Sequence, residues 1–230
     1  MYPTFLIAGP PKSATTSLHF YLGQHPQVFM SRVKETEFFT RDYHKGKAFY
    51  QHYFANADKA VSIGEATPSY SFLPFAADRI QETIPHVKII FCFRNPMERA
   101  FSHWLTLWSE GIEKESFSKA ITINKEQLKY VNFQGEPGSV QWNKTARHEK
   151  KEKNWIRPYL HPGMYVQSLR IYFERFERKN IWIIFLEDLK DNFDKTMKDI
   201  FVFLGVDGNF IIPQKDVQNF SYNKRFTATL

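Results

Sequence analysis

The sequence predicts a single three-layer α/β domain in which helices cover both faces of a mainly parallel central sheet. Short apolar runs that are typical of buried strands alternate along the chain with longer segments of helical periodicity. A turn rich in hydroxyl side chains follows the first apolar run, which is the place of a P-loop-like phosphate-binding turn. The length of 230 residues fits one domain spanning residues 1–230.

Four apolar runs bounded by turn-forming residues predict strands at residues 5–8, 61–64, 87–93 and 181–186. Helices are expected at residues 16–22, 45–54, 74–84, 96–109, 116–129, 164–178 and 193–204. Pro96 suits the first turn of its helix, and Gly205 suits the end of the last helix. Because parallel strands are joined by crossover connections, this alternation places helices on both faces of the sheet.

Residues 132–158 interrupt the pattern. They contain Gly135, Pro137 and Gly138 together with mixed charges, which predicts a long surface loop. Within this segment, residues 143–157 carry a local net charge of +4. A solvated loop is one interpretation of that run, and a contact surface for an anionic acceptor such as a polysaccharide is the other.

The composition favours an anionic ligand and excludes some classes of site. Lys plus Arg (31) exceed Asp plus Glu (24), which gives a net charge of +7. Cys92 is the only cysteine, which excludes an internal disulfide framework, and the eight histidines are scattered, so we expect no metal site. The apolar run at 5–8 is too short to span a membrane and follows no basic segment. We therefore expect a cytoplasmic protein without a membrane segment.

The first expected strand is followed by a turn that begins at Gly9 and leads into a helix. Such a turn directs several backbone N–H groups and a helix N-terminus at one point, which makes an anion site. The expected phosphate contacts are consecutive residues of this turn: Lys12, Ser13, Ala14, Thr15, Thr16 and Ser17. A capped helix start with a surface lysine is the competing interpretation.

The turn differs from a Walker A loop, which requires Gly-x-x-x-x-Gly-Lys followed by Ser or Thr. Here Lys12 comes three residues after Gly9, no glycine precedes it directly, and Ala14 lies two residues after it. The strand expected at 87–93 is followed by Arg94 and not by an aspartate that could hold magnesium. A nucleoside-triphosphate kinase therefore fits poorly.

A second candidate anion site follows the strand at 87–93. Arg94 comes directly after that strand, where open α/β sheets bind ligands, and its guanidinium can bind a phosphate through two hydrogen bonds. Ser102 lies eight positions further on, about two helical turns, so its hydroxyl can reach the same phosphate. Pairing of Arg94 with Glu98, or capping of the following helix by Arg94, is the alternative interpretation of the arginine.

In these two motifs, the turn at Lys12 and the segment that begins at Arg94, the sequence resembles sulfotransferases that use 3′-phosphoadenosine 5′-phosphosulfate. It resembles most closely the branch of the heparan sulfate sulfotransferases and their bacterial relatives. Residues 11–18 resemble the loop of that family that binds the 5′-phosphosulfate, and residues 94–102 resemble its 3′-phosphate motif. The segments 34–39 (KETEFF), 64–70 (GEATPSY) and 187–189 (EDL) match further family motifs in the family's order. The resemblance covers about residues 4–205.

The resemblance implies a catalytic arrangement and a cofactor. The donor would be 3′-phosphoadenosine 5′-phosphosulfate, the product adenosine 3′,5′-bisphosphate, and the acceptor an unidentified hydroxyl or amine compound, anionic or carbohydrate, with no nucleic acid as partner. Lys12 takes the role that stabilises the leaving phosphate, and Glu35 occupies the position of the catalytic base. Glu37 nearby would form a like-charge pair, which raises the pKa of one carboxyl group.

Residues in two further regions of the chain correspond to family positions. Glu65 follows a short strand, and it either lines the cleft or supports the core. Ala66 stands where better-known heparan sulfate enzymes carry a catalytic lysine, so a second positive charge must come from elsewhere or is dispensed with. Near the C-terminus, Lys224 and Arg225 match the start of the basic segment that closes over the nucleotide in the family.

Three functional hypotheses therefore follow from the sequence. The leading one is a sulfotransferase. The second is a non-catalytic module that binds polyanions, which the basic run at 143–157 suggests. The third is a P-loop nucleotide kinase, which requires magnesium.

Overall fold

The structure is a computed structural model that describes residues 1–145 and 155–216. Its centre is one parallel sheet with the strand order β2-β3-β1-β4-β5. The strands are β1 Phe5–Ile7, β2 Val28–Met30, β3 Ser62–Ala66, β4 Lys88–Phe93 and β5 Ile181–Phe185. The helices are α1 Thr15–Leu22, α2 Gly46–His52, α3 Pro74–Thr83, α4 Pro96–Ser109, α5 Phe117–Gln127, α6 Gly135–Thr145, α7 Tyr165–Phe173, α8 Leu186–Asp191 and α9 Phe193–Leu204.

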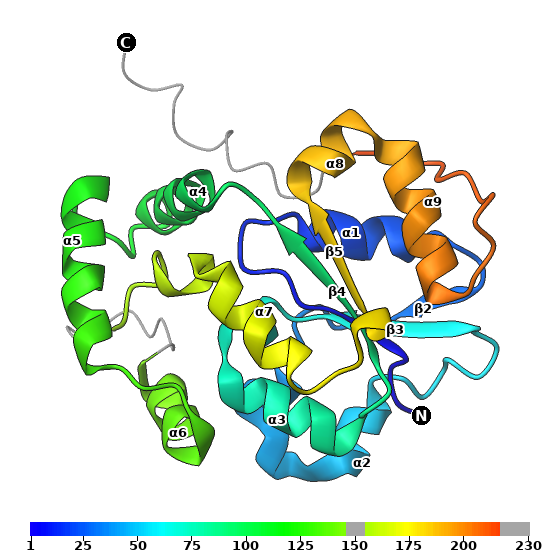
Figure 1. Cartoon of the computed structure of the whole chain (residues 1–230), viewed down its shortest axis with the longest axis horizontal. Helices are drawn as coiled ribbons and strands as arrows, with labels where there is room; N and C mark the ends of the chain where they lie inside the picture. The colour runs from blue at the N-terminus through cyan, green and yellow to red at the C-terminus, as the bar shows by residue number, and fades with distance from the viewer. Residues whose placement is uncertain (146–154, 217–230) are drawn as a thin grey trace.

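The three-layer α/β architecture expected from the sequence is confirmed. Helices α1, α8 and α9 lie on one side of the sheet, and α2, α3 and α7 lie on the other (Figure 1). The alternation of side chains along β1 explains this: Phe5 and Ile7 pack with α1 and α9, whereas Leu6 packs with α2, α3 and α7. Both faces of the sheet are therefore buried, which is typical of parallel sheets.

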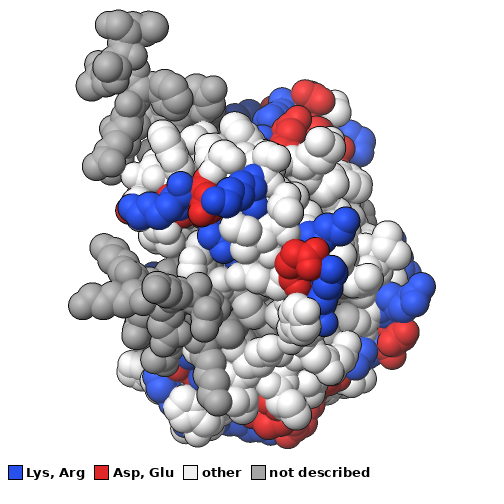
Figure 2. Space-filling model, turned by 90° about the vertical axis from the view of Figure 1, so that its left-hand side faces the viewer, with Lys and Arg blue, Asp and Glu red and all other residues white. Residues whose placement is uncertain are grey.

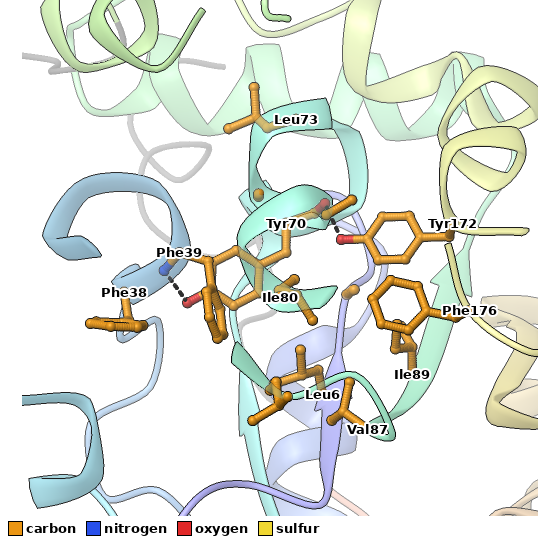
Figure 3. Packing of buried hydrophobic residues seen from close by; sticks show 14 of the residues in the cluster. Leu6, Phe38, Phe39, Tyr70, Leu73, Ile80, Val87, Ile89, Tyr172 and Phe176 are labelled. Atoms are coloured by element: carbon orange, nitrogen blue, oxygen red, sulfur yellow. Dashed lines mark hydrogen bonds between the residues drawn. The ribbon is translucent and has the colours of Figure 1, made fainter. Parts of the chain in front are cut away.

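The larger core is unusually aromatic and contains a few buried hydroxyl groups. Tyr70 lies at its centre (Figure 3), where its hydroxyl accepts a hydrogen bond from the Phe39 backbone N–H at 3.2 Å. Tyr172 of α7 donates to the Tyr70 carbonyl at 2.7 Å. These bonds tie the segment before α2 and helix α7 to the turn after β3.

The sheet places two segments at the same edge. β1 pairs directly with β4, with Ile7 opposite Ile90, so the chain leaves both strands at neighbouring carboxyl ends. From β1 the chain passes β3 to reach β2 at one edge of the sheet. From β3 it moves in the opposite direction, past β1, to reach β4. In open α/β sheets, ligands bind in the crevice where the strand order reverses in this way.

The prediction of a surface loop over residues 132–158 is wrong for residues 135–145, which form α6. Tertiary packing overrides the glycine and proline signals there. Phe133 and Trp142 stack edge-on at 5.7 Å, and Trp142 also contacts the ring of Phe72 at 5.6 Å. Gly138 lies against the Phe133 backbone, where a Cβ would come within 2.3 Å, so glycine permits this helix instead of ending it. Residues 146–154 lie outside the described residues.

Besides α6, strand β2 and helix α8 were not predicted, and other differences concern the ends of the helices and strands. β2 has only three residues, which is too short an apolar run to predict a strand. Only its first residue, Val28, is buried. α8 is a single short helix between β5 and α9. The helix expected at 164–178 ends at Phe173, and the strand expected at 61–64 extends to Ala66.

Candidate active site at the carboxyl ends of β1 and β4

The turn after β1 has the backbone conformation of an anion site. Lys12 and Ala14 both have positive φ, of 73° and 63°, and α1 begins directly after them at Thr15. Left-handed residues in such a turn direct successive N–H groups to one side, and the helix N-terminus adds its partial positive charge. Ser13, Thr15 and Ser17 are buried in this turn, and Thr16 is partly exposed.

Gly9 lets this turn lie close to β4. A Cβ at Gly9 would come within 2.5 Å of the Cys92 carbonyl oxygen and 2.9 Å of the Thr15 side chain. Because the nearest atom belongs to the backbone of a central strand, it cannot move aside. Glycine is therefore required here by close approach, and the turn is held beside the end of β4.

At the end of β4, the chain turns into α4 with a well-formed cap. The Asn95 side chain accepts hydrogen bonds from the backbone N–H groups of Met97 and Glu98, so asparagine and not Arg94 caps the helix. Arg94 instead pairs with Glu98 at 2.9 Å. That pair is the alternative that the sequence left open, and it is compatible with a ligand because Glu98 is exposed and its interaction is weak.

Electrostatics link the two segments. Burial lowers the pKa of Lys12; Glu110 opposes this change, and the positive charges of Arg94 and Lys34 add to it. The sheet explains this link, because β1 lies between β3 and β4, and Glu35, the residue after Lys34, bonds to Ala66 at the end of β3. Lys12, Lys34 and Arg94 therefore lie at the carboxyl ends of three neighbouring strands, and Ser102 is partly exposed on α4. Lys34 was not among the predicted site residues, and its place beside the KETEFF segment was the signal for it.

The segment 34–39 carries the two candidate carboxylates in a strained conformation. Glu35 and Glu37 have positive φ, of 62° and 49°, and the Glu35 N–H donates to the Ala66 carbonyl at 2.9 Å. The Glu35 side chain is 45% exposed and is paired with Lys34. No helix begins within residues 34–37, and a π-helical turn starts at Phe38.

Glu37 lies in surroundings that change its pKa. Burial raises the pKa of Glu37, the guanidinium of Arg41 at 3.3 Å lowers it, and Glu35 and Asp42 raise it further. The expected like-charge pair is therefore present, but its contribution is smaller than that of burial. The choice of Glu35 as the base stays a prediction.

Glu65 supports the core and does not line the cleft. Its carboxylate is fully buried and accepts hydrogen bonds from four hydroxyl groups, which we call the Glu65 cluster: Thr36 at 2.6 Å, Tyr50 at 2.6 Å, Thr67 at 2.8 Å and Tyr70 at 3.2 Å. Burial raises the pKa of Glu65, and these four bonds oppose that change. Because Thr36 lies between the two candidate bases, the cluster holds the segment that carries them.

The remaining predicted residues lie outside the described residues. Lys224 and Arg225 are in the segment 217–230, and most of the basic run lies in 146–154. On the face that α5 presents, positive and negative side chains lie side by side with uncharged surface between them (Figure 2). Ion pairs within or beside α5, such as Lys119–Glu115 and Lys129–Glu126, account for part of this mixture.

Comparison with known proteins gives the family. A family model described as the sulfotransferase domain matches residues 2–227, so this chain belongs to the sulfotransferase domain family. Human bifunctional heparan sulfate N-deacetylase/N-sulfotransferase 2 is 27% identical over 212 residues, which are 89% of this chain and 22% of that protein. Membrane-associated sulfotransferase kil1 of Dictyostelium discoideum is 36% identical over 105 residues, which are 44% of this chain and 22% of that protein.

Solved structures agree in fold. A sulfotransferase from Alicyclobacillus acidocaldarius superimposes with a TM-score of 0.76 at 24% identity, over 96% of this chain and 87% of the other. Mouse sulfotransferase SULT7A1 complexed with PAP gives a TM-score of 0.52 at 18% identity, over 89% and 59% of the two chains. The chain spans about a fifth of the length of the curated relatives it matches (22%).

Two further findings concern the described residues alone. Within residues 1–145 and 155–216, no group of three or more His, Cys, Asp or Glu side chains is placed to hold a metal ion. None of the helices in this part of the chain is both long and apolar enough to cross a membrane.

Proposed function

We propose that this chain transfers a sulfuryl group from 3′-phosphoadenosine 5′-phosphosulfate to a hydroxyl or amine group of an acceptor. The observation that carries the proposal is the placement of two anion-binding segments, the turn at Lys12 and the arginine at Arg94, at the carboxyl ends of adjacent strands. Family membership supports the same reaction. A carbohydrate acceptor is supported by the similarity to heparan sulfate N-deacetylase/N-sulfotransferases.

The residues present fit a nucleotide with a phosphate group at each end. The turn offers backbone N–H groups and Lys12 for the 5′-phosphosulfate, and the end of β4 offers Arg94 and Ser102 for the 3′-phosphate. Ser13, Thr15, Thr16 and Ser17 add hydroxyl groups within the turn, and Lys224 and Arg225 would close over the nucleotide.

Sulfuryl transfer needs an in-line acceptor, a base for the acceptor proton and stabilisation of the charge on the leaving phosphate. As the bond from sulfur to the 5′-phosphate oxygen breaks and the bond to the acceptor forms, Lys12 and the turn N–H groups stabilise the phosphate. Glu35, or Glu37 two residues further on, accepts the acceptor proton. Lys34 is available as the second positive charge that Ala66 does not provide.

Binding of adenosine 3′,5′-bisphosphate tests the proposal. The structure of mouse sulfotransferase SULT7A1 is a complex with PAP, which is adenosine 3′,5′-bisphosphate, so this bisphosphate is the natural probe. At about a hundredfold excess over its dissociation constant, the ligand should stabilise the protein by about 2.7 kcal/mol, measured as a shift in thermal unfolding. Absence of any shift would contradict the proposal.

Turnover tests the chemical step. With labelled donor and a panel of carbohydrate, phenolic and amine acceptors, the unaltered protein should label at least one acceptor, and Lys12→Ala should abolish labelling. A polyanion-binding module would give salt-sensitive retention on a heparin matrix with no labelling of any acceptor. That result would replace the enzymatic proposal.

A further inference from the structure

Arg99 is a buried positive charge that no carboxylate in the described part of the chain neutralises. Its side chain is fully buried in α4. Nη1 donates to the Pro11 carbonyl at 3.4 Å, Nη2 donates to the Tyr159 carbonyl, and Nε has no hydrogen-bond partner. Both partners are neutral. Burial lowers the pKa of Arg99 to about 10, which reflects the cost of this placement.

Two other arginines with little exposure are treated differently by the fold. The Arg79 side chain, 10% exposed, pairs with Glu136 at 2.8 Å, and that of Arg157, 12% exposed, pairs with Glu113 at 2.8 Å. Pairing is the usual solution because an isolated buried charge is expensive. Arg99 is more buried than either and has only carbonyl oxygens, so its counter-charge must come from outside these contacts.

The position of Arg99 indicates where that counter-charge lies. Pro11, which receives the Nη1 bond, is the residue before Lys12 in the phosphate turn. The positive charge of Arg94 also lowers the pKa of Arg99, and Tyr165 opposes this change. The Tyr165 hydroxyl donates to the Arg94 carbonyl at 2.8 Å. Arg99 therefore contacts the phosphate turn directly through Pro11, and its backbone N–H donates to the carbonyl of Asn95, the residue after Arg94.

We infer that the bis-phosphorylated nucleotide is the counter-ion of Arg99. Arg99 is then a positioning residue that acts on the nucleotide indirectly: it holds the phosphate turn through Pro11, and its positive charge attracts the phosphate groups. This inference rests on the proposed function. Because the charge is buried, solvent and salt screen it less than they screen Arg94, whose pairing with Glu98 is partly exposed. The charge of Arg99 acts on both phosphate groups, whereas Lys12 and Arg94 each act mainly on one.

Calorimetric titration with adenosine 3′,5′-bisphosphate tests this inference in Arg99→Gln and Arg99→Lys. Gln keeps a donor but removes the charge, and it should weaken binding by about tenfold to a hundredfold. Lys keeps the charge and should bind several times more tightly than the Gln variant. Raising the salt concentration should reduce the loss caused by Arg94→Gln but leave the loss caused by Arg99→Gln largely unchanged.

Arg79→Gln is the matched control, because it breaks a well-buried arginine pair away from the turn. It should lower the thermal stability of the free protein and leave the dissociation constant unchanged. If Arg99→Gln behaves in the same way, Arg99 is only structural and the inference is wrong. Should Arg99→Gln fail to fold, Arg99→Met against Arg79→Met decides, because Met also removes the charge and tolerates burial: equal affinity for the bisphosphate together with an equal loss of stability overturns the inference.

Two mononucleotides give an independent readout. Lys12→Ala should mainly weaken binding of adenosine 5′-phosphate, Arg94→Gln should mainly weaken adenosine 3′-phosphate, and Arg99→Gln should weaken both. An effect of Arg99→Gln on neither overturns the inference. Failure of the unaltered protein to bind the bisphosphate would instead contradict the proposed function, so the two failures are distinguishable.

Discussion

Four residues other than glycine have positive φ in the described part of the chain, and all four lie in the two segments that carry the predicted catalytic residues: Lys12, Ala14, Glu35 and Glu37. Each such residue costs on the order of 1 kcal/mol, and strain of this kind persists only where surrounding contacts enforce it. Those contacts are visible here, in the close approach at Gly9 and in the Glu65 cluster. Strain concentrated in these two segments supports a functional role for both.

At the scale of single residues, the two candidate bases can be separated by paired variants. Glu35→Gln should reduce turnover by about a hundredfold or more while the dissociation constant for the bisphosphate changes little, since a general base contributes about that much. Glu37→Gln is the matched control, with the same chemical change two residues away. Steady-state turnover with labelled donor measures both. Full turnover in Glu35→Gln with loss in Glu37→Gln would reassign the base to Glu37, whose pKa burial raises.

The Glu65 cluster predicts a pH dependence of stability. Burial raises the pKa of Glu65 above its ordinary value of 4.5, so in that range the folded protein binds more protons than the unfolded chain. The carboxyl group therefore favours folding less as the pH rises above about 4.5. Glu65→Gln removes this term, so its free energy of unfolding relative to the unaltered protein should increase with pH.

Glu113 provides the control of opposite sign. Burial raises its pKa, but hydrogen bonds from Arg157, the Glu115 backbone and Tyr159 outweigh this and lower it overall. Glu113→Gln should therefore lose stability relative to the unaltered protein as the pH rises into and through the ordinary glutamate range. Urea unfolding at several pH values measures both variants. Slopes of the same sign would contradict the assignment of Glu65.

At the scale of elements, the phosphate turn depends on a glycine that touches a strand. Gly9→Ala would place a Cβ 2.5 Å from the Cys92 carbonyl, so the turn or β4 must shift, at a cost of about 1–3 kcal/mol. Affinity for the bisphosphate should fall together with stability. Gly163→Ala is the control, because its Cβ would meet nothing closer than 3.5 Å. Equal behaviour of the two variants would show that the close approach at Gly9 is unimportant.

The elements also show what a sequence can and cannot predict. Strands β1, β3, β4 and β5 and the turn after β1 follow from apolar runs and hydroxyl residues, which are local signals. α6 was missed because its Gly138 packs against Phe133, a contact that no local pattern contains. The alternatives for Arg94 and Glu65 likewise needed geometry: the sequence placed both near the site, but only tertiary contacts reveal one paired with Glu98 and the other buried.

At the scale of the whole molecule, the arrangement of charge predicts that turnover does not require a metal ion. Lys12, Lys34 and Arg94 gather where an anionic donor would bind, and these cations can neutralise the charge that magnesium neutralises in kinases. Turnover with labelled donor should therefore persist in an excess of chelator. Loss of turnover in chelator and its recovery on adding magnesium would favour the kinase hypothesis.

The central claim is that the turn after β1 and Arg94 after β4 bind opposite ends of one nucleotide. A crystal structure of the protein with adenosine 3′,5′-bisphosphate tests it most directly. We predict the 5′-phosphate at Lys12 and the N–H groups of the turn, and the 3′-phosphate within hydrogen-bond distance of Arg94 and Ser102. A nucleotide that contacts only one of these segments, with the other facing a separate cavity, would contradict the account.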